Sequence, residues 1–568
     1  MKTAEELRSA LRAIDHRSYP AYKSLAGSWF FGTYALNIEH VQGDPFAAPS
    51  QLSVTLDRKT AGFPASCWES PWNRTALEDY LLRRFARQAG RFSRQAKGSG
   101  KSGVLAVTAP GQEVLERTDC QVCAGAVTLR FEVGFPANGR TINARELEKI
   151  LFEFLPVCVE QGLLYASAPQ GETARIMALA EDQHFIRQEL ERLELAAFVS
   201  DGSILPRESG VSDRPMRGAV PFQSPKELAV TLELPHRGAV RGMGVHRGIT
   251  LIAGGGYHGK STLLKALERG VYNHIAGDGR EYVITDGSAV KIRAEDGRKV
   301  TDTDISLFIS HLPSGRDTTR FSTLDASGST SQAANIAEAL EAGSRVLLMD
   351  EDTSATNFMV RDELMQAVIA REQEPITPFL ERAVDLWQKA GVSLILVVGS
   401  CGAYFHIADK VVQMDAYHAR DITEQAKAAL EGRPAPTLTA PGFHLPAGNR
   451  AVDLSGGSQL RKNYRGDGYR QERLKVKCFG KTAFSVGDRE LDLRYVEQLA
   501  DGGQARALAY MVRYAREHLA GRTVEAVVTA LMKLMEEKGL GAVCGGGVVP
   551  AGLTMPRTQE IFACFDRY

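Results

Sequence analysis

The sequence has little of several features that would narrow its function. Lys plus Arg and Asp plus Glu number 68 each, so net charge gives no indication of a nucleic-acid partner. No run approaches the ~20 apolar residues of a membrane span, and the first 22 residues have charges throughout and no apolar signal core. The 8 cysteines suit a reducing compartment. These absences favour a cytoplasmic protein with no membrane partner, and an apolar content of 44% is enough for real cores.

One glycine-rich segment matches every fixed position of the phosphate-binding loop, G-x-x-x-x-G-K-[ST]. An apolar, strand-like run at 249–253 precedes it, and a helix-like run at 262–267 follows it. In this order the glycines let successive backbone N–H groups converge on an anion at a helix N-terminus. Lys260 would reach the β- and γ-phosphates, and the Ser261 hydroxyl would coordinate Mg²⁺. The pattern predicts nucleoside triphosphate binding by Gly254, Gly255, Gly256, Tyr257, His258, Gly259, Lys260, Ser261 and Thr262.

A second motif lies about ninety residues later, where the apolar run 345–349 ends in Asp350 and Glu351. A buried strand ending in Asp is how phosphate-loop enzymes hold Mg²⁺ opposite the loop hydroxyl. Glu351 would then orient the attacking water and accept its proton. The alternative is a surface strand that ends in solvated acids, and the phosphate loop upstream disfavours it. We therefore assign catalysis to Glu351, Lys260 and Asp350, and Mg²⁺ binding to Ser261 and Asp350.

A serine-glycine pair opens a helical stretch about twenty residues before the Asp-Glu strand. Ser327, Gly328 and Ser329 stand at its start, and apolar residues at helical spacing follow. Taken alone, the pair is an ordinary helix N-cap and turn. Its position relative to the other two motifs favours a functional role in nucleotide binding.

Together these motifs resemble the predicted ATPases of the ABC class, a group distinct from transporter subunits. The resemblance rests on residues 254–261, 321–335 and 350–358, and extends to 40–47, 292–298 and 496–499. It implies an ABC-like core with added terminal parts, a loop at 354–357 that follows the catalytic strand, and a nucleotide-sandwich dimer. In that dimer, Ser327, Gly328 and Ser329 of one subunit would contact the γ-phosphate bound by the other. Some relatives are associated with RNA.

The chain departs from the ABC pattern at three positions. Ala326 and Ser329 stand where the signature has a leading Leu and a second Gly. Ser400 occupies the place of the switch histidine, and His406 lies six residues beyond it. The sequence leaves open which of the two replaces that histidine. A missing histidine removes a hydrogen-bonding partner of the γ-phosphate, so we expect slow turnover.

Two further segments resemble the motifs by letter, and we reject both. Residues 454–459 match the ABC signature more closely than 326–331 do, but the sequence after them is a poor helix former. Residues 98–102 end in Gly-Lys-Ser, yet position 95, where a phosphate loop has its first glycine, is Gln95. We interpret the first as a loop and the second as a flexible polar turn.

The predicted fold class is α/β. We expect a P-loop NTPase core of the ABC ATPase type with a mixed or parallel sheet at 221–430, an α+β N-terminal domain at 1–220, and a mainly helical C-terminal region at 431–568. Proline, glycine and serine at 205–225 suggest a linker between the first two parts.

A run of basic residues between positions 80 and 103 contains no acidic residue. Four of its arginines have three- and four-residue spacings, so they could share one helix face and neutralise phosphates. A solvated helix face is about equally compatible with the pattern. A second basic cluster, at 461–477, includes Tyr464 and Tyr469, which could stack on bases. The basic residues of the first run are Arg83, Arg84, Arg87, Arg91, Arg94, Lys97 and Lys101.

These observations lead to three hypotheses. The first is a Mg²⁺-dependent, ABC-class ATPase homodimer that uses ATP to clamp or remodel a nucleic acid, RNA more than DNA. The second is a slowly hydrolysing, nucleotide-gated scaffold that binds a protein. The third, a small-molecule kinase, leaves Ser327, Gly328 and Glu351 without a purpose.

Overall fold

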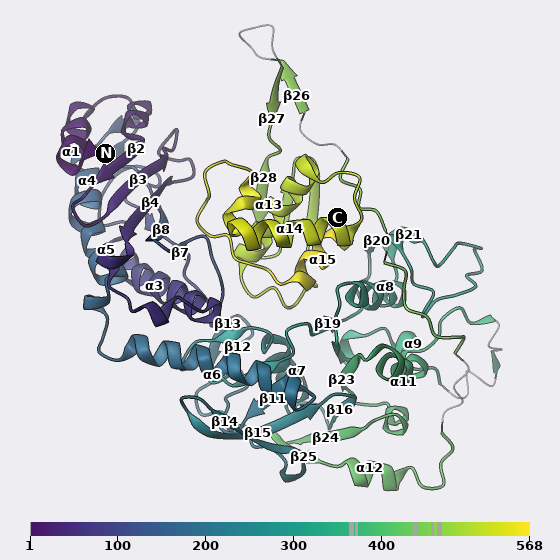
Figure 1. The fold of residues 1–568 in the computed structure, drawn as a ribbon. Helices are drawn as coiled ribbons and strands as arrows, with labels where there is room; N and C mark the ends of the chain where they lie inside the picture. The colour runs from purple at the N-terminus through teal and green to yellow at the C-terminus, as the bar shows by residue number, and fades with distance from the viewer. Residues whose placement is uncertain are drawn as a thin grey trace. The chain divides into compact units, whose positions relative to one another are not determined.

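The structure is a computed structural model that describes residues 2–362, 368–369, 373–435, 440–448, 450–455, 459–462 and 469–568. The chain forms two compact units (Figure 1). The first contains Met1–Glu181 and Leu534–Met555, and the second contains Asp182–Lys533 and Pro556–Tyr568. The division into parts at 220 and 430 stays a prediction.

The first unit is built on a seven-stranded sheet. Its longest pairing is antiparallel, between β4 (Ser50–Asp57) and β8 (Ala126–Val133). Alternate residues of β8 are buried, as expected for a sheet that packs one face against helices. The sheet order is β1-β2-β3-β4-β8-β5, with β7 also paired to β8, and the other strands are β1 (Lys2–Thr3), β2 (Gly27–Phe30), β3 (Ala35–His40), β5 (Leu105–Ala106) and β7 (Cys120–Val122).

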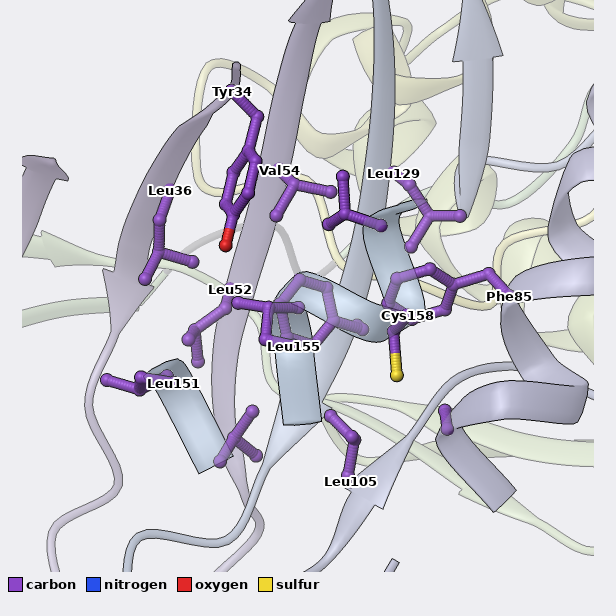
Figure 2. Close-up of a cluster of buried hydrophobic side chains, with 14 of the residues drawn as sticks. Tyr34, Leu36, Leu52, Val54, Phe85, Leu105, Leu129, Leu151, Leu155 and Cys158 are labelled. Carbon is purple, nitrogen blue, oxygen red and sulfur yellow. The ribbon is translucent and has the colours of Figure 1, made fainter. Parts of the chain in front are cut away.

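Helices supply the other half of this unit's core. Side chains of α5 (Leu155–Leu163) pack on the buried face of β3, β4 and β8. Figure 2 shows Leu155 and Cys158 of α5 among Leu52 and Val54 of β4 and Phe85 of α3 (Pro71–Phe92). The remaining helices of the first 181 residues are α1 (Ala4–Ala13), α2 (Arg58–Ala61) and α4 (Ala144–Lys149), and α6 (Glu172–Arg192) begins there.

The second unit contains a six-stranded sheet of order β19-β22-β23-β16-β24-β25. All its pairs are parallel except β24 with β25. The three central strands β22, β23 and β16 are buried along their whole length, as in sheets covered on both faces. The strands are β16 (Ile249–Ala253), β19 (Val290–Ile292), β22 (Val346–Asp350), β23 (Ser393–Val397), β24 (Lys410–Asp415) and β25 (His418–Asp421).

This sheet positions the site, because the carboxyl ends of parallel strands meet at one edge. The chain segments that follow β16, β22 and β23 are the three on which the sequence places the chemistry. The helices of this region are α7 (Lys260–Arg269), α8 (Gly328–Glu341), α9 (Thr356–Met359), α11 (Phe379–Ala390) and α12 (Thr423–Ala429). The predicted α/β class with a mixed sheet is confirmed.

A second, antiparallel sheet of order β14-β15-β11-β18 lies in the same unit, as does the hairpin β20 (Arg298–Thr303) with β21 (Phe321–Ala326). The predicted linker at 205–225 is wrong as a plain connection, because it folds into a hairpin of β12 (Arg207–Ser209) and β13 (Ser212–Pro215). The strands of the antiparallel sheet are β11 (Leu195–Ser200), β14 (Ala229–Leu234), β15 (Gly238–His246) and β18 (Val283–Thr285).

The C-terminal stretch combines helices with a small sheet. Strands β28 (Val476–Phe479), β29 (Ala483–Val486) and β30 (Arg489–Asp492) pair in order. The helices are α13 (Gly502–His518), α14 (Val524–Lys538) and α15 (Thr558–Arg567). Buried charges tie α15 to the core: Arg567 contacts Glu295 at 2.5 Å. Residues 456–458 and 463–468, and with them much of the second basic cluster and the rejected signature, lie outside the described residues.

Candidate nucleotide-binding site

The glycine-rich loop 254–259 connects β16 directly to α7, as the sequence predicts. Gly254 has φ +138°, and a Cβ there would lie 2.4 Å from the carbonyl oxygen of Met414. Gly259 has φ +98° immediately before the helix. Both positions therefore require glycine. Gly256, in contrast, has nothing within 4 Å of the place a Cβ would take.

The lysine of the motif is held at the loop. The Lys260 ammonium donates to the carbonyl oxygens of Gly254 at 2.6 Å and Gly255 at 2.8 Å. The Tyr257 side chain, in the middle of the same loop, is 99% exposed. A cation thus lies at the mouth of a helix N-terminus, where unpaired amides and the helix dipole also favour an anion.

A turn that the sequence did not single out braces the loop. The ring Nδ1 of His258 accepts a hydrogen bond from the amide of Ala416 at 2.9 Å, and the amide of Tyr417 donates to the carbonyl of His258 at 3.2 Å. Ala416 and Tyr417 have φ values of 45° and 70° in the turn between β24 and β25. The His258 side chain thus fixes the loop against this turn. The sequence could not predict this turn, because neither alanine nor tyrosine favours the left-handed region of the backbone.

A pocket of about 770 Å³ opens beside the loop. This volume is within the range of sites that enclose a small-molecule ligand. One wall is the loop with the start of α7, and a second comes from the segment around the β12–β13 hairpin. Among the residues that line the pocket are Gly255, Gly256, Tyr257, Gly259, Lys260, Ser261, Thr262, Asp352, Met414 and Tyr417.

The two acidic residues at the end of β22, Asp350 and Glu351, have different surroundings. Asp350 is buried, and its carboxylate accepts a hydrogen bond from the amide of Asp352 at 3.2 Å. Glu351 accepts from the amides of Gly399 at 2.6 Å and Ser400 at 3.1 Å, and from the Ser400 hydroxyl. Burial opposes ionisation of Glu351, but these donors outweigh it and lower its pKa. The side chain proposed as the base is therefore ionised and fixed in place.

A half-buried cation lies beside these acids and is a residue that sequence reasoning missed. Lys291, on β19, is 3.4 Å from the Thr353 hydroxyl. Burial lowers its pKa, and the charges of Glu497 and Asp350 act in the opposite direction. Glu497 also pairs with Arg293 at 3.0 Å. The sequence did contain one hint, because the resemblance to the ABC-class ATPases extends to residues 292–298 and 496–499. The Arg293–Glu497 ion pair joins these two segments.

The proposed signature segment begins α8, as predicted. Ser327 is the N-cap, and its hydroxyl lies 3.1 Å from that of Thr330. One turn later, Gln332 accepts from the amide of Ala355 at 2.8 Å and donates to the hydroxyl of Ser354 at 3.1 Å. The start of α8 is therefore linked to the loop that follows Glu351.

Comparison with known proteins decides the family. A family model described as the P-loop domain of ABC_ATPase matches residues 169–445, and one described as ATPase of the ABC class N-terminal matches residues 4–166. A third, the MRB1590 C-terminal domain, matches residues 475–568. The chain belongs to the ABC-class ATPases.

One curated relative of this ABC-class ATPase is the uncharacterized protein MJ1628 of Methanocaldococcus jannaschii. It is 30% identical over 249 residues, which are 42% of this chain and 54% of the relative. The chain therefore spans about half the length of that relative.

Solved structures similar to the chain include two ABC proteins. One is the ADP conformation of MJ1267, an ATP-binding cassette of an ABC transporter, at 13% identity over 42% of this chain and 96% of that one. The other is a bacterial Atm1-family ABC exporter with ATP bound, at 13% identity over 47% and 50% of the two chains. Both TM-scores are 0.25. No helix in the described part of the ABC-class ATPase is long and apolar enough to cross a membrane.

The geometry bears on two points that the sequence leaves open for this ABC-class ATPase. Ser400 contacts Glu351, whereas the described residues show no hydrogen bond from His406 to that carboxylate. Ser327, Gly328 and Ser329 are not among the residues that line the pocket at the loop. The structure thus does not bring the signature segment and the phosphate loop of one chain to the same pocket.

The predicted arginine face on α3 is wrong in part. Arg84 is buried and donates to the carbonyls of Gln161 at 2.6 Å and Leu164 at 3.2 Å. Arg83 is half-buried and pairs with Asp79 at 2.6 Å. A single sequence cannot distinguish a buried arginine that donates to carbonyls from a solvated one. The exposed basic residues of this run are Arg87, Arg91, Arg94, Lys97 and Lys101.

Proposed function

We propose that this ABC-class ATPase binds ATP with Mg²⁺ and hydrolyses it as a homodimer, and that the cycle clamps or remodels a nucleic acid, RNA more than DNA. One observation carries the catalytic part of the proposal. Three segments follow neighbouring parallel strands of one sheet and so lie at the same edge of it: the phosphate loop after β16, the acids at the end of β22, and the Gly399–Ser400 turn after β23. This is the edge at which α/β proteins bind nucleotides.

The residues present fit a magnesium triphosphate. The pocket is large enough, the Lys260 ammonium is held at its edge, and Ser261 lines it. Ser261 and Asp350 supply the oxygen ligands that Mg²⁺ prefers, and phosphate oxygens would complete the set. Bound Mg²⁺ supplies charge neutralisation on the phosphates. Lys260 would contact the β- and γ-phosphates from the loop side.

Glu351 is suited to position the attacking water and accept its proton. A general base must be ionised and fixed within reach of its target. The hydrogen bonds from Gly399 and Ser400 supply both conditions, because they lower the Glu351 pKa and fix the carboxylate. Glu351 also lies beside the phosphate-loop lysine, since a Cβ at Gly399 would be 3.9 Å from the Lys260 ammonium and 4.0 Å from the Glu351 carboxylate.

A second copy of the chain would complete the site. Ser327, Gly328 and Ser329 present hydroxyls and a helix N-terminus, which suit an anion, yet they are not part of the pocket at the loop. In a nucleotide-sandwich dimer the partner's copy of this segment would contact the γ-phosphate. The link between Gln332 and Ala355 would couple that contact to Glu351 of the same chain.

The exposed basic residues at the end of α3 support a nucleic-acid partner. They stand in a run of sequence without acidic residues and can neutralise phosphates without reading bases. The 8 cysteines suit a reducing compartment, and we propose that the protein is cytoplasmic.

The test is a titration of labelled single-stranded RNA and duplex DNA at two salt concentrations, with and without Mg-ATP. We expect salt-sensitive RNA binding that shifts with ATP and weakens when Arg87, Arg91 and Arg94 are replaced by glutamine. A matched control replaces three exposed basic residues of the same unit, Arg17, Lys23 and Lys59. Equal losses in both variants, or no binding in any state, would exclude this surface as the nucleic-acid site.

The alternative is a slowly hydrolysing, nucleotide-gated scaffold with a protein partner. The observation that favours it is Ser400 in the place of the switch histidine. Phosphate release no faster than that of a Glu351→Gln variant, together with intact ATP binding, would select the scaffold.

A further inference from the structure

The wall of the pocket that faces the phosphate loop is apolar. It comes from the segment 205–222, which contains the β12–β13 hairpin. In the described chain, every residue of this segment that lines the pocket is apolar or glycine. Within the wall, Leu205 and Phe222 are buried, whereas Met216 is 41% and Val220 39% exposed. The wall thus presents two apolar side chains on a buried apolar support.

The wall is anchored, so it exists before any ligand binds. The Arg207 guanidinium pairs with the Asp278 carboxylate at 2.8 Å and donates to the Asp278 carbonyl at 2.8 Å. The amide of Ile204 donates to the carbonyl of Gly279, and that of Met216 to Pro206. Burial opposes ionisation of Asp278, but His274 and Arg207 together lower its pKa, so this anchor is charged.

Two large side chains of the phosphate loop and the bracing turn also line the pocket and are exposed. Tyr257, in the loop, is 99% exposed, and Tyr417, in the bracing turn, is 57% exposed. Large apolar side chains grouped around one pocket mark a binding surface. A triphosphate on the loop carries at its other end a nucleobase, whose two flat faces are aromatic, and the apolar wall lines the same pocket as the loop.

We propose that Met216 and Val220 hold the nucleobase by apolar contact, and that the site therefore accepts ATP and GTP with similar affinity. The inference rests on the proposed function, since it assumes that the phosphates lie on the loop. Strong discrimination between bases requires polar groups that pair with the base edge. Among the described residues, the wall has no polar side chain to do so. We expect the affinities for ATP and GTP to differ by less than about tenfold.

Calorimetric titration with ATP, GTP and inorganic tripolyphosphate, each with Mg²⁺, tests the wall separately from the loop. The test variant is Met216→Ser with Val220→Ser. The control is Val211→Ser, because Val211 is 96% exposed at the hairpin turn and does not line the pocket. We expect the double variant to lose about tenfold in affinity for both nucleotides and to keep its affinity for tripolyphosphate. The control should bind all three as the unmodified protein does.

The outcomes separate two kinds of failure. Unchanged nucleotide binding by the double variant, or a preference of more than a hundredfold for one purine, would overturn the apolar base site while leaving the loop intact. Failure of the unmodified protein to bind tripolyphosphate and both nucleotides would overturn the proposed function itself. Thermal unfolding of each variant checks that the unit is folded. If a folded double variant lost affinity for all three ligands, Met216 and Val220 would not act through the nucleobase alone, and the proposal would be overturned.

Discussion

Residues 98–103 and residues 254–261 both contain glycines and the letters Gly-Lys-Ser, yet they have different structures. In the first segment the glycines are packed against backbone. A Cβ at Gly103 would lie 1.9 Å from the carbonyl oxygen of Ala96, and one at Gly100 would lie 2.6 Å from that of Pro45. In the second segment, Gly256 has nothing within 4 Å. The glycines of the first loop allow close packing, whereas in the second loop Gly254 packs against backbone and Gly256 leaves space for a ligand.

The hydrogen bonds of the two loops differ in the same way. In the first, the amides of Ser99, Lys101 and Gly103 donate to the carbonyls of Ala137, Pro45 and Gly134 at 2.8, 2.8 and 2.9 Å. Its donors are therefore used inside the protein. The second loop ends at the first turn of α7, where amides have no intrahelical partner. For anion binding, the helix that follows the motif is therefore as important as the residue types of the motif itself. Four predictions test this contrast between the two loops.

The largest difference between the two loops should appear when the acidic residue near each loop is replaced. Glu351→Gln should lower kcat for ATP hydrolysis about 10² to 10⁴-fold and leave nucleotide binding intact, because the amide cannot accept a proton. The matched control is Glu146→Gln, since Glu146 accepts from the amide of Lys97 beside the first loop. Steady-state phosphate release and calorimetric binding measure both. A normal rate in Glu351→Gln would show that another group acts as the base.

The two lysines should differ next. Lys260→Ala removes the ammonium that lies at the phosphate loop, so we expect ATP affinity to fall about 100-fold. Lys101→Ala removes an exposed side chain from the packed turn and should leave affinity unchanged. Calorimetric titration with Mg-ATP compares them. Equal losses in the two variants would show that the first turn also binds nucleotide.

The glycines should differ in stability. Gly103→Ala places a Cβ against backbone at φ +76° and should cost about 3 kcal/mol of unfolding free energy. Gly256→Ala should change it by less than about 0.5 kcal/mol, because the site is open. Trp29, Trp68 and Trp72 all lie in the unit that contains Gly103, so urea unfolding followed by tryptophan fluorescence detects its loss. A stable Gly103→Ala variant would mean that the turn can open.

The sequence predicted those parts of the site that are local in the chain. The phosphate loop, the strand that ends in Asp350 and the helix that opens at Ser327 each have residue types fixed by short-range geometry, and all three elements form as expected. Contacts between distant segments had no such signal. The Ala416–Tyr417 turn on His258, Lys291 beside Asp350, and the apolar wall at 205–222 depend on how strands far apart in sequence meet.

Burial was the second limit of sequence-based prediction. Arg84 and Arg87 lie on one helix three residues apart, and only packing against the carbonyls of Gln161 and Leu164 makes the first a structural residue. The segment 205–225 has the composition of a linker, but ionic and backbone hydrogen bonds order it as a wall. Both cases turn on partners that composition does not reveal.

The smallest expected effect concerns two serines, Ser400 near the phosphate loop and Ser102 in the packed turn. Ser400→Ala removes one donor to the Glu351 carboxylate, so the pKa of Glu351 should rise toward its usual value. The carboxylate is then held less firmly, so kcat at neutral pH should fall about tenfold. Because a protonated Glu351 cannot accept a proton, the decline of kcat on acidification should begin at a higher pH than in the unmodified protein. Ser400→Thr keeps the hydroxyl and should restore the pH profile.

Ser102→Ala, which removes the hydroxyl that donates to the Ser99 carbonyl at 2.6 Å, should lower stability and leave kcat and its pH profile unchanged. An unshifted profile in Ser400→Ala would assign the low Glu351 pKa to the Gly399 and Ser400 amides alone.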